Sequence, residues 1–350
     1  MKSKNCKNIA IFGAGGFIGS HLVKKLLIDS QSFNIICLDI TDKKIKKLIP
    51  SKEINFIFCD IKVDSCLIND IIQNSDIVID LVAYANPIIY LDKPIEVVEL
   101  NLFNNLKLVD YCMKYQKYLI QFSTCEVYGK SGGNLSPFKE EETDLILGPI
   151  CNHRWIYSCA KQLLERIIHA RGMRGELEYT IIRPFNFIGP EMDYLVYSKN
   201  DGTPRVFPHF MSSLLYNHPI YVVDGGNNRR TFTYIEDAIN AVIIILKNLD
   251  KTRNQIINIG SPENDISIKG LAYKMKEIYA LITGTKSDIP IIDIPSDKFY
   301  GVGYEDCDLR IPDISKLKKL SWEPKYNLDD TLRKSIEYYL LEGEGVIKYQ

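Results

Sequence analysis

The stretch IFGAGGFIGSH, residues 11–21, limits the possible folds of this chain more than any other part of the sequence. Gly13, Gly16 and Gly19 stand between a short apolar run, NIAIFG, and a segment whose apolar residues recur with helical spacing, HLVKKLLI. Glycines in this arrangement let backbone N–H groups approach a pyrophosphate, and the N-terminus of the following helix adds partial positive charge. The stretch therefore predicts a strand, a tight turn and a helix that bind a dinucleotide.

The next apolar run, residues 34–40, carries a carboxylate where a bound dinucleotide would need one. Asp39 lies about 20 residues beyond the glycines, where its side chain can accept hydrogen bonds from the adenosine ribose. The same carboxylate would repel the additional phosphate of NADP, so we expect the cofactor to be NAD. Asp60 ends the third strand, where Asp60 and Ile61 are placed to flank the adenine. The structural alternative is that the glycines only make a tight turn.

Strands and crossover segments alternate through the first half of the chain. Continuous rather than alternating hydrophobicity is typical of strands covered on both faces, so we expect a doubly wound parallel sheet, an α/β fold of the Rossmann type. The expected strands are residues 8–13, 34–40, 54–60, 76–83, 118–124 and 179–185.

The local composition changes after Phe185, where the chain becomes rich in Gly, Pro and polar residues. This change predicts a domain boundary. We expect a NAD-binding domain over residues 1–186, with a return segment at about 230–258. Residues 187–229 and 259–350 would form a smaller substrate-binding domain.

Composition limits the partners and the compartment. The 350 residues are 46% hydrophobic and carry a formal net charge of −1, which favours neither nucleic acid nor an anionic membrane surface. No stretch approaches the roughly 20 apolar residues of a membrane span, and glycines interrupt the first apolar run too soon for a signal peptide. The nine cysteines contain no C-x-x-C pair. We therefore expect a cytoplasmic protein with a small-molecule partner and no metal site.

Tyr157 and Lys161, in RWIYSCAKQ, stand four positions apart at the start of a predicted amphipathic helix. This spacing puts both side chains on one face of the helix, where the ammonium would lower the pKa of the phenol. A hydroxyl that loses a hydride to a nicotinamide needs such a base. A packed tyrosine beside a solvated lysine is the alternative, but the upstream glycine turn and Ser123 and Thr124 at a strand end favour the catalytic interpretation.

These residues together resemble the extended short-chain dehydrogenase/reductase superfamily, the NAD-dependent epimerase/dehydratase family, over essentially the whole chain. Several motifs are similar to those of UDP-glucuronic acid decarboxylases, including the decarboxylase domain of the polymyxin-resistance enzyme, and of UDP-apiose/UDP-xylose synthases. The motifs are STCEVYGK, GPICNHRWIYSCAKQ, IIRPFNFIGPEMD, GTPRV, DGGNNRRTFTYIEDA and GYEDCDLRIPD. The resemblance implies oxidation of a nucleotide sugar at C4, followed by loss of its C6 carboxylate as CO2.

The resemblance also implies roles for individual residues. Thr124 would hydrogen-bond the C4 hydroxyl, and Glu126 would lie near C5 and C6, where it would destabilise the substrate carboxylate or handle a proton. Cys125 would face the same pocket, either as a reactive thiol or only as a small residue. Arg310 would bind the carboxylate or deliver a proton. Tyr128 is more typical of packing than of chemistry.

Two sets of residues complete the predicted site. The predicted cofactor-binding residues are Gly13, Gly16, Phe17, Ile18, Gly19, Asp39, Asp60, Ile61, Tyr157 and Lys161. The predicted substrate-binding residues are Tyr90, Arg154, Asn186, Arg205, Arg230, Tyr304 and Asp306.

The sequence departs from the resembled enzymes at three positions. Tyr221 stands where they generally carry a lysine that contacts the nucleotide, which weakens the assignment of uridine as the base. Ala85 replaces a cysteine that the apiose synthases associate with ring contraction, and Asn86 replaces a threonine. Simple loss of CO2 is therefore favoured over ring contraction.

We accordingly predict an NAD-dependent decarboxylase of UDP-glucuronic acid that gives UDP-4-keto-pentose or UDP-xylose. UDP-apiose/xylose synthesis, 4-epimerisation, 4,6-dehydration and C4 dehydrogenation are alternatives within the same fold. A catalytically silent NAD-binding regulatory protein is the non-enzymatic alternative, which an intact Tyr157 and Lys161 argue against. Residues 94–116 and 156–171 are predicted to form long helices with apolar faces, and the resemblance implies that they pair in a homodimer.

Overall fold

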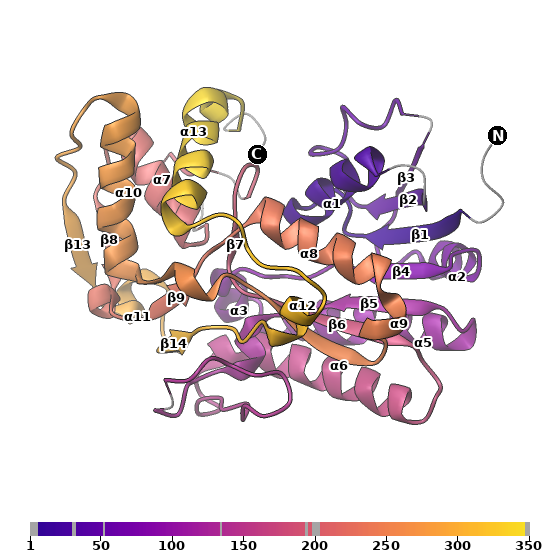
Figure 1. Ribbon diagram of the computed structural model, residues 1–350. Helices are drawn as coiled ribbons and strands as arrows, with labels where there is room; N and C mark the ends of the chain where they lie inside the picture. Colours follow the sequence, from indigo (N-terminus) through magenta and orange to yellow (C-terminus); the bar gives the residue numbers. More distant parts are fainter. Residues whose placement is uncertain are drawn as a thin grey trace.

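The computed structural model of the protein describes residues 6–29, 33–51, 53–133, 135–192, 195–197 and 204–346. Its centre is a seven-stranded parallel sheet with the strand order β11-β6-β5-β4-β1-β2-β3. Helices cover both faces of the sheet, as Figure 1 shows, so the fold is the predicted doubly wound α/β type. The strands are β1 Lys7–Phe12, β2 Phe33–Asp39, β3 Ile54–Phe58, β4 Ile77–Asp80, β5 Tyr118–Phe122, β6 Tyr179–Pro184 and β11 Gln255–Ile259.

The first strand illustrates why its sequence is apolar throughout. Ile9 and Ile11 are buried in one hydrophobic cluster with helices α1 and α8, whereas Ala10 and Phe12 are buried in another with α5 and α6. Successive side chains of a strand point to opposite faces, so both faces of β1 require apolar residues. All six runs predicted as strands form strands of this sheet, most of them shorter than predicted by one to four residues. The seventh, β11, was not predicted individually.

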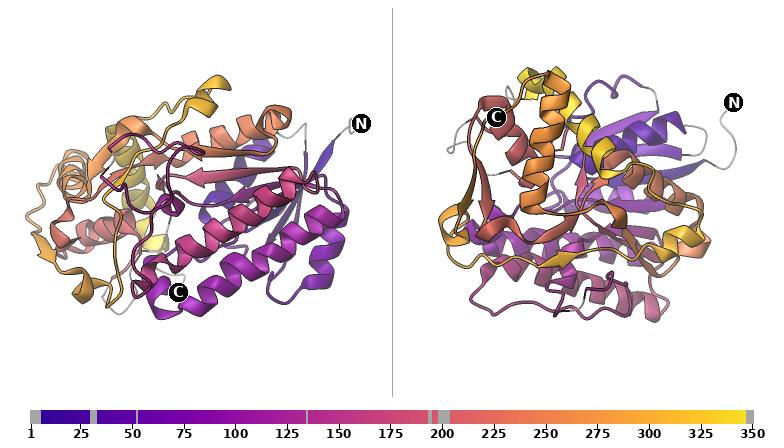
Figure 2. Two further views of the ribbon diagram at one scale, coloured as in Figure 1. Left: turned by 90° about the horizontal axis from the view of Figure 1, so that it is seen from below. Right: turned by 60° about the vertical axis from the view of Figure 1, so that its left-hand side comes forward.

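The helices of the large sheet lie in two layers. Residues 94–114 form one continuous helical stretch, in which a π-helical turn, Glu99–Asn104, joins α4 to α5. This stretch and α6 lie side by side on one face of the sheet, as the left view of Figure 2 shows. The helices are α1 Phe17–Ile28, α2 Ser65–Gln73, α3 Pro87–Asp92, α4 Pro94–Val98, α5 Asn105–Lys114, α6 Ile156–Met173, α8 Ile235–Lys247, α9 Leu249–Thr252 and α12 Ser315–Lys319.

A smaller part of the molecule lies to one side of the large sheet (Figure 1). Its small sheets pair β8 with β13, β7 with β10, and β9 with both β12 and β14. Its elements are β7 Phe187–Ile188, α7 Val206–Tyr216, β8 Ile220–Val223, β9 Arg229–Thr231, β10 Thr233–Tyr234, β12 Asp265–Ser267, α10 Ile268–Thr283, β13 Ile291–Ile294, α11 Ser296–Phe299, β14 Leu309–Arg310 and α13 Leu328–Val346.

The predicted return segment, residues 230–258, contains elements of both parts. It begins in β9, passes through α8 and ends in β11 at the edge of the large sheet. The predicted division of the chain into two domains stays a prediction. Among the residues that the structure describes, no helix combines the length and the apolar character needed to cross a membrane.

Candidate active site

The glycine turn joins β1 to α1 at the position where the strand order reverses. β1 lies between β2 and β4, and in open α/β sheets ligands bind at the carboxyl ends of strands at such a switch point. Gly13 has a φ of +85°, a conformation that favours glycine. A Cβ atom on Gly19 would lie 2.2 Å from the carbonyl oxygen of Gly13, so the first turn of α1 packs against the loop only without a side chain there.

Asp39 lies at the end of β2, directly beside this turn. Its Oδ2 accepts a hydrogen bond of 2.9 Å from the backbone N–H of Gly15, and its Oδ1 accepts one of 3.1 Å from that of Thr41. Burial raises the pKa of Asp39, and the two backbone N–H groups act against this increase. The turn, the helix N-terminus and this carboxylate are the elements that a dinucleotide requires, so the residues present fit NAD.

Asp60 and Ile61, predicted to flank the adenine, follow β3 at the next position in the sheet. The Oδ1 atom of Asp60 accepts a hydrogen bond of 2.9 Å from the backbone N–H of Lys62, and Ile61 is buried. Both residues and Asp39 lie outside the lining of the two main cavities of the described residues. Their contact with adenosine therefore stays a prediction.

Tyr157 and Tyr90 form the uncharged end of the site. Their rings are stacked with centroids 4.6 Å apart and an angle of 9° between the planes, and both rings are buried. Thr124 caps the short helical turn after β5, where its Oγ1 accepts a hydrogen bond from the backbone N–H of Glu126, and it also hydrogen-bonds the Tyr157 side chain. Thr124, Tyr157 and Tyr90 line one cavity together with the glycine turn.

The prediction that Lys161 lowers the pKa of Tyr157 is wrong for the protein without a bound cofactor. Burial and the nearby negative charge of Glu126 raise the pKa of Tyr157 well above its usual value. Lys161 is buried and lines neither cavity, and its Nζ donates a hydrogen bond of 3.2 Å to the carbonyl oxygen of Phe122. Burial lowers the pKa of Lys161, although the charges of Asp80 and Glu165 favour its protonated form.

A buried cluster of charged side chains forms the other end of the site. Glu126 accepts a hydrogen bond of 2.5 Å from Arg154 and one of 3.3 Å from Arg310. Asp306 lies 2.6 Å from a nitrogen of Arg230 and 3.7 Å from one of Arg310. The three arginine side chains are at most 5% exposed. We call these five residues the charge cluster.

The charge cluster contains three guanidinium groups and two carboxylates, which leaves an excess of one positive charge. Burial alone would raise the pKa of Glu126, but Arg154 and Arg310 outweigh it and lower this pKa to about 2. Burial likewise acts against Asp306, whose pKa Arg230, Arg310 and Arg154 lower to about 2. The Nε atoms of Arg154 and Arg310 are buried and have no hydrogen-bond partner among the described residues. Since buried polar groups are normally paired, these donors point to an anionic ligand.

The expectation that Glu126 would repel a substrate carboxylate is therefore corrected. Two guanidinium groups offset its charge, so the immediate surroundings of Glu126 are positive overall. Cys125, beside it, is buried, and burial raises the pKa of its thiol, so the thiol stays protonated at neutral pH. Tyr128 is buried, and its hydroxyl donates a hydrogen bond of 2.9 Å to Asn258, in agreement with the packing interpretation.

Two cavities meet at the charge cluster. One cavity contains the glycine turn and the tyrosine pair, and the other extends into the smaller part of the molecule. Of the predicted site residues, the first cavity is lined by Gly13, Gly16, Phe17, Ile18, Gly19, Tyr90, Thr124, Cys125, Glu126, Tyr157, Asn186, Arg205 and Arg310. The second is lined by Glu126, Arg154, Asn186, Arg205, Arg230, Tyr304, Asp306 and Arg310.

The second cavity also contains Phe299, Tyr300 and His209, which sequence analysis did not select. Tyr300 and Tyr304 are stacked with ring centroids 4.1 Å apart, and Phe299 packs edge-on against Tyr300. His209 lies 5.3 Å from the ring of Phe299, and burial lowers its pKa to about 4. Three aromatic residues within DKFYGVGYED, just before Arg310, are the sequence pattern that could have indicated this aromatic lining.

The fold and the site together define a Rossmann-type, NAD-dependent enzyme in which Tyr157 lines the cavity of the glycine turn and buried arginines line a second cavity. The sequence model described as the NAD dependent epimerase/dehydratase family matches residues 9–260. The protein belongs to this family, which confirms the predicted resemblance and NAD as the cofactor.

Relatives extend the similarity over nearly the whole chain. UDP-D-apiose/UDP-D-xylose synthase of Oryza sativa subsp. japonica is 41% identical, over 98% of this chain and 91% of the relative. UDP-D-apiose/UDP-D-xylose synthase 1 of Arabidopsis thaliana is 40% identical, over 94% and 90% respectively. The solved structure of the PbgP3 protein from Burkholderia pseudomallei has a TM-score of 0.86 and 32% identity, covering 98% of each chain.

Proposed function

We propose that this protein is a nucleotide-sugar enzyme that oxidises and decarboxylates UDP-glucuronic acid. The observation that carries the proposal is the buried charge cluster, with its excess positive charge and unpaired arginine donors, where the two cavities meet. A uronic acid supplies the missing negative charge at C6. The similarity to two plant synthases named for UDP-apiose and UDP-xylose supports the same class of substrate.

Oxidation at C4 is assigned to the uncharged end of the site. Tyr157 takes the proton of the C4 hydroxyl, and Thr124 hydrogen-bonds that hydroxyl and orients it. The glycine turn and Asp39 would hold NAD, which would supply the hydride acceptor, and the positive charge of its nicotinamide ring would favour the phenolate form of Tyr157. The stack of Tyr90 on Tyr157 fixes the plane of the phenol.

Decarboxylation is assigned to the charge cluster. The oxidised sugar is a β-keto acid, because the ketone at C4 lies two bonds from the C6 carboxylate carbon. The C5–C6 bond breaks, CO2 leaves, and the electron pair forms an enolate with its charge on the C4 oxygen. Arg310 and Arg154 hold and orient the carboxylate, and Tyr157 and Thr124 donate to the C4 oxygen of the enolate. Glu126, ionised at neutral pH, fixes both guanidinium groups.

The second cavity is assigned to the nucleotide. Asn186, Arg205 and Arg230 line it, and an amide and two cations are suited to a diphosphate. Tyr221 also lines this cavity, 6.4 Å from the ring of Phe299, in place of the lysine expected from the resemblance. An aromatic ring there favours stacking with a base over a charged contact.

The product is assigned as a 4-keto-pentose or xylose nucleotide rather than the branched apiose nucleotide. Ala85 lines both cavities and brings no thiol to the position that the apiose synthases fill with cysteine. Apiose formation remains the alternative that the two named plant relatives favour. A 4-epimerase or 4,6-dehydratase would not need Arg310 beside Glu126, and the buried protonated Cys125 is a poor acid for a leaving hydroxide.

The proposal is tested by incubating the purified protein with NAD and UDP-glucuronic acid while the NADH absorbance and the mass of the nucleotide sugar are followed. A product lighter by one CO2 is expected, and net NADH separates ketone release from xylose formation. An unchanged substrate would contradict the proposal, and other nucleotide sugars would then be compared. Bound NAD without turnover of any of them would support the regulatory alternative.

We also propose a homodimer. The helical stretch 94–114 and α6 lie side by side and carry exposed apolar side chains, whose burial would favour association. These side chains are Ile95, Phe103, Leu163 and Met173. Light scattering at micromolar concentration is expected to give twice the chain mass, and a monomeric mass would contradict the dimer.

A further inference from the structure

Glu305 lies between Tyr304 and Asp306, two residues that line the second cavity. The side chain of Glu305 does not line this cavity and makes contacts elsewhere. Its Oε2 accepts hydrogen bonds from the indole Nε1 of Trp155 at 2.6 Å and from Nδ2 of Asn152 at 3.0 Å. Its Oε1 pairs with the ammonium of Lys130. One carboxylate therefore holds three donors from two other segments of the chain.

These segments carry four of the five residues of the charge cluster, all except Arg230. Lys130 follows the short helical turn Cys125–Tyr128, which contains Glu126. Asn152 and Trp155 stand on either side of Arg154 along the chain. The segment of Glu305 itself continues to Arg310. Since the cluster residues are separated by up to 184 positions in the chain, their relative placement depends on contacts between these segments.

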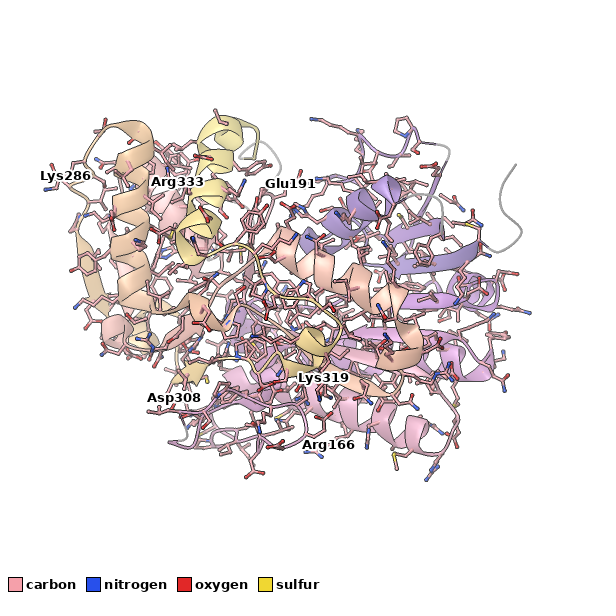
Figure 3. The ribbon with its side chains drawn as sticks, in the orientation of Figure 1. Arg166, Glu191, Lys286, Asp308, Lys319 and Arg333 are labelled. Carbon is pink, nitrogen blue, oxygen red and sulfur yellow. The ribbon has the colours of Figure 1, made fainter. Side chains whose placement is uncertain are left out.

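Two further contacts hold the same three segments together. The backbone N–H of Arg154 donates a hydrogen bond of 3.3 Å to the carbonyl oxygen of Gly303. Ser131 donates to Asp308 from its backbone N–H at 2.9 Å and also from its hydroxyl. Figure 3 labels Asp308 next to strand β14, where the 303–310 segment meets the loop before α6.

The space around Glu305 is also fitted to its carboxylate. A Cβ atom on Gly148 would lie 1.8 Å from Oε2 of Glu305 and 2.4 Å from the indole nitrogen of Trp155. Burial acts to raise the pKa of Glu305, but Lys130, Trp155 and Asn152 outweigh it and lower this pKa. The carboxylate is therefore ionised at neutral pH. Its side chain is about a quarter exposed and lines neither cavity, so it does not touch the substrate.

We propose that Glu305 is a positioning residue for the decarboxylation step. By joining the segments of Glu126, Arg154 and Arg310 through Lys130, Asn152 and Trp155, it sets the spacing of the charge cluster. Among the described residues, its side chain makes no hydrogen bond or ion pair with Tyr157 or the glycine turn, so we expect C4 oxidation to depend on it much less than decarboxylation does. This inference rests on the proposed oxidative decarboxylation.

The test compares Glu305→Ala and Glu305→Gln with a control variant, Glu142→Ala. This control removes an exposed ion pair between Glu142 and Lys139, both of which lie on the loop before α6. For each protein, single-turnover NADH formation and CO2 release from UDP-glucuronic acid are measured separately. CO2 release by Glu305→Ala is expected to fall about tenfold while NADH formation stays within twofold. Glu305→Gln keeps an acceptor for Trp155 but loses the ion pair, so an intermediate loss is expected. Glu142→Ala should match the wild type.

Affinity gives a second readout that a general loss of stability would not change. The ratio of the dissociation constants for UDP-glucose and UDP-glucuronic acid, measured by calorimetry, reports how well the cluster holds the carboxylate. This ratio is expected to fall about tenfold in Glu305→Ala. If that variant does not fold, Trp155→Phe, which removes only the indole N–H donor, is expected to lower the ratio by a smaller factor.

Equal loss of NADH formation and CO2 release, or no loss in either, would overturn the positioning role. Failure of the proposed function has a different signature, because the wild-type protein itself would then release no CO2. The affinity ratio would still test the positioning role of Glu305 in that case, and an unchanged ratio in Glu305→Ala, Glu305→Gln and Trp155→Phe would overturn it.

Discussion

The two ends of the active site differ in charge and in how the chain assembles them. The oxidation end consists of the uncharged, stacked rings of Tyr90 and Tyr157 with Thr124, and most of it comes from the end of β5 and the start of α6. The charge cluster is buried, carries an excess positive charge and joins residues up to 184 positions apart. A hydride transfer needs a base and a bound cofactor, whereas recognition of one particular sugar acid needs a matched counter-charge. Under the proposed function, the first end carries out the oxidation and the second selects the sugar acid.

The largest expected effect comes from the oxidation end. Tyr157→Phe removes the proton acceptor and is expected to slow single-turnover NADH formation by about 10³-fold, within the range found for general bases. CO2 release should fall equally, because it requires the ketone. Tyr128→Phe is the matched control, since that hydroxyl bonds Asn258 and lines neither cavity. NADH formation at the wild-type rate in Tyr157→Phe would remove this residue from the mechanism.

The second-largest expected effect distinguishes decarboxylation at the charge cluster from oxidation at Tyr157. Arg310→Ala removes a donor that holds and orients the carboxylate and is expected to slow CO2 release by about 10²-fold, while NADH formation and NAD binding are retained. The keto acid should then accumulate and be visible by mass. Arg229→Ala is the control, because the exposed side chain of this β9 residue binds Asp265 and no residue of the charge cluster, while its backbone stays unchanged. Decarboxylation at the wild-type rate would exclude Arg310.

A smaller effect is expected at the cofactor. Asp39→Asn keeps the shape of the side chain but loses its charge, and a charge-assisted hydrogen bond to the ribose corresponds to at least about a tenfold change in affinity. The dissociation constant of NAD should rise by that factor while that of UDP-glucuronic acid is unchanged. Discrimination against NADP should also weaken. Fluorescence titration with both cofactors measures this, and unchanged affinities would disprove the ribose contact.

The smallest effect concerns stability in acid. The pKa of Glu126 is lowered from 4.5 to about 2 and that of Asp306 from 3.8 to about 2. Because both values are lower in the folded state, their stabilisation is fully present above about pH 4.5 and is lost as the pH falls towards 2. Tyr157 stays neutral over this range and contributes nothing. The melting temperature of Glu126→Gln should therefore fall less between pH 4.5 and 3 than that of the wild type, and equal slopes would contradict this linkage.

The sequence predicts the oxidation end better than the charge cluster for a physical reason. The glycine turn with Asp39 and the Tyr157/Lys161 pair are local patterns, in which spacing along the chain fixes the geometry. Even there, the pKa of Tyr157 was predicted in the wrong direction, because spacing does not report burial or the neighbouring Glu126. The cluster residues were identified only through the family resemblance, and their pairing depends on tertiary contacts. No sequence pattern indicated a role for Glu305, since its hydrogen-bond partners lie about 150 residues or more away in the chain.

The central claim is that oxidation at one end of the site prepares decarboxylation at the other. A single-turnover reaction with NAD and UDP-glucuronic acid carrying ¹³C at C6 tests it most directly. The account predicts that NADH appears first and that labelled CO2 follows in an equal amount, leaving a nucleotide pentose without label. NADH formation with the label retained in the nucleotide sugar, or inversion at C4 without any CO2, would contradict it.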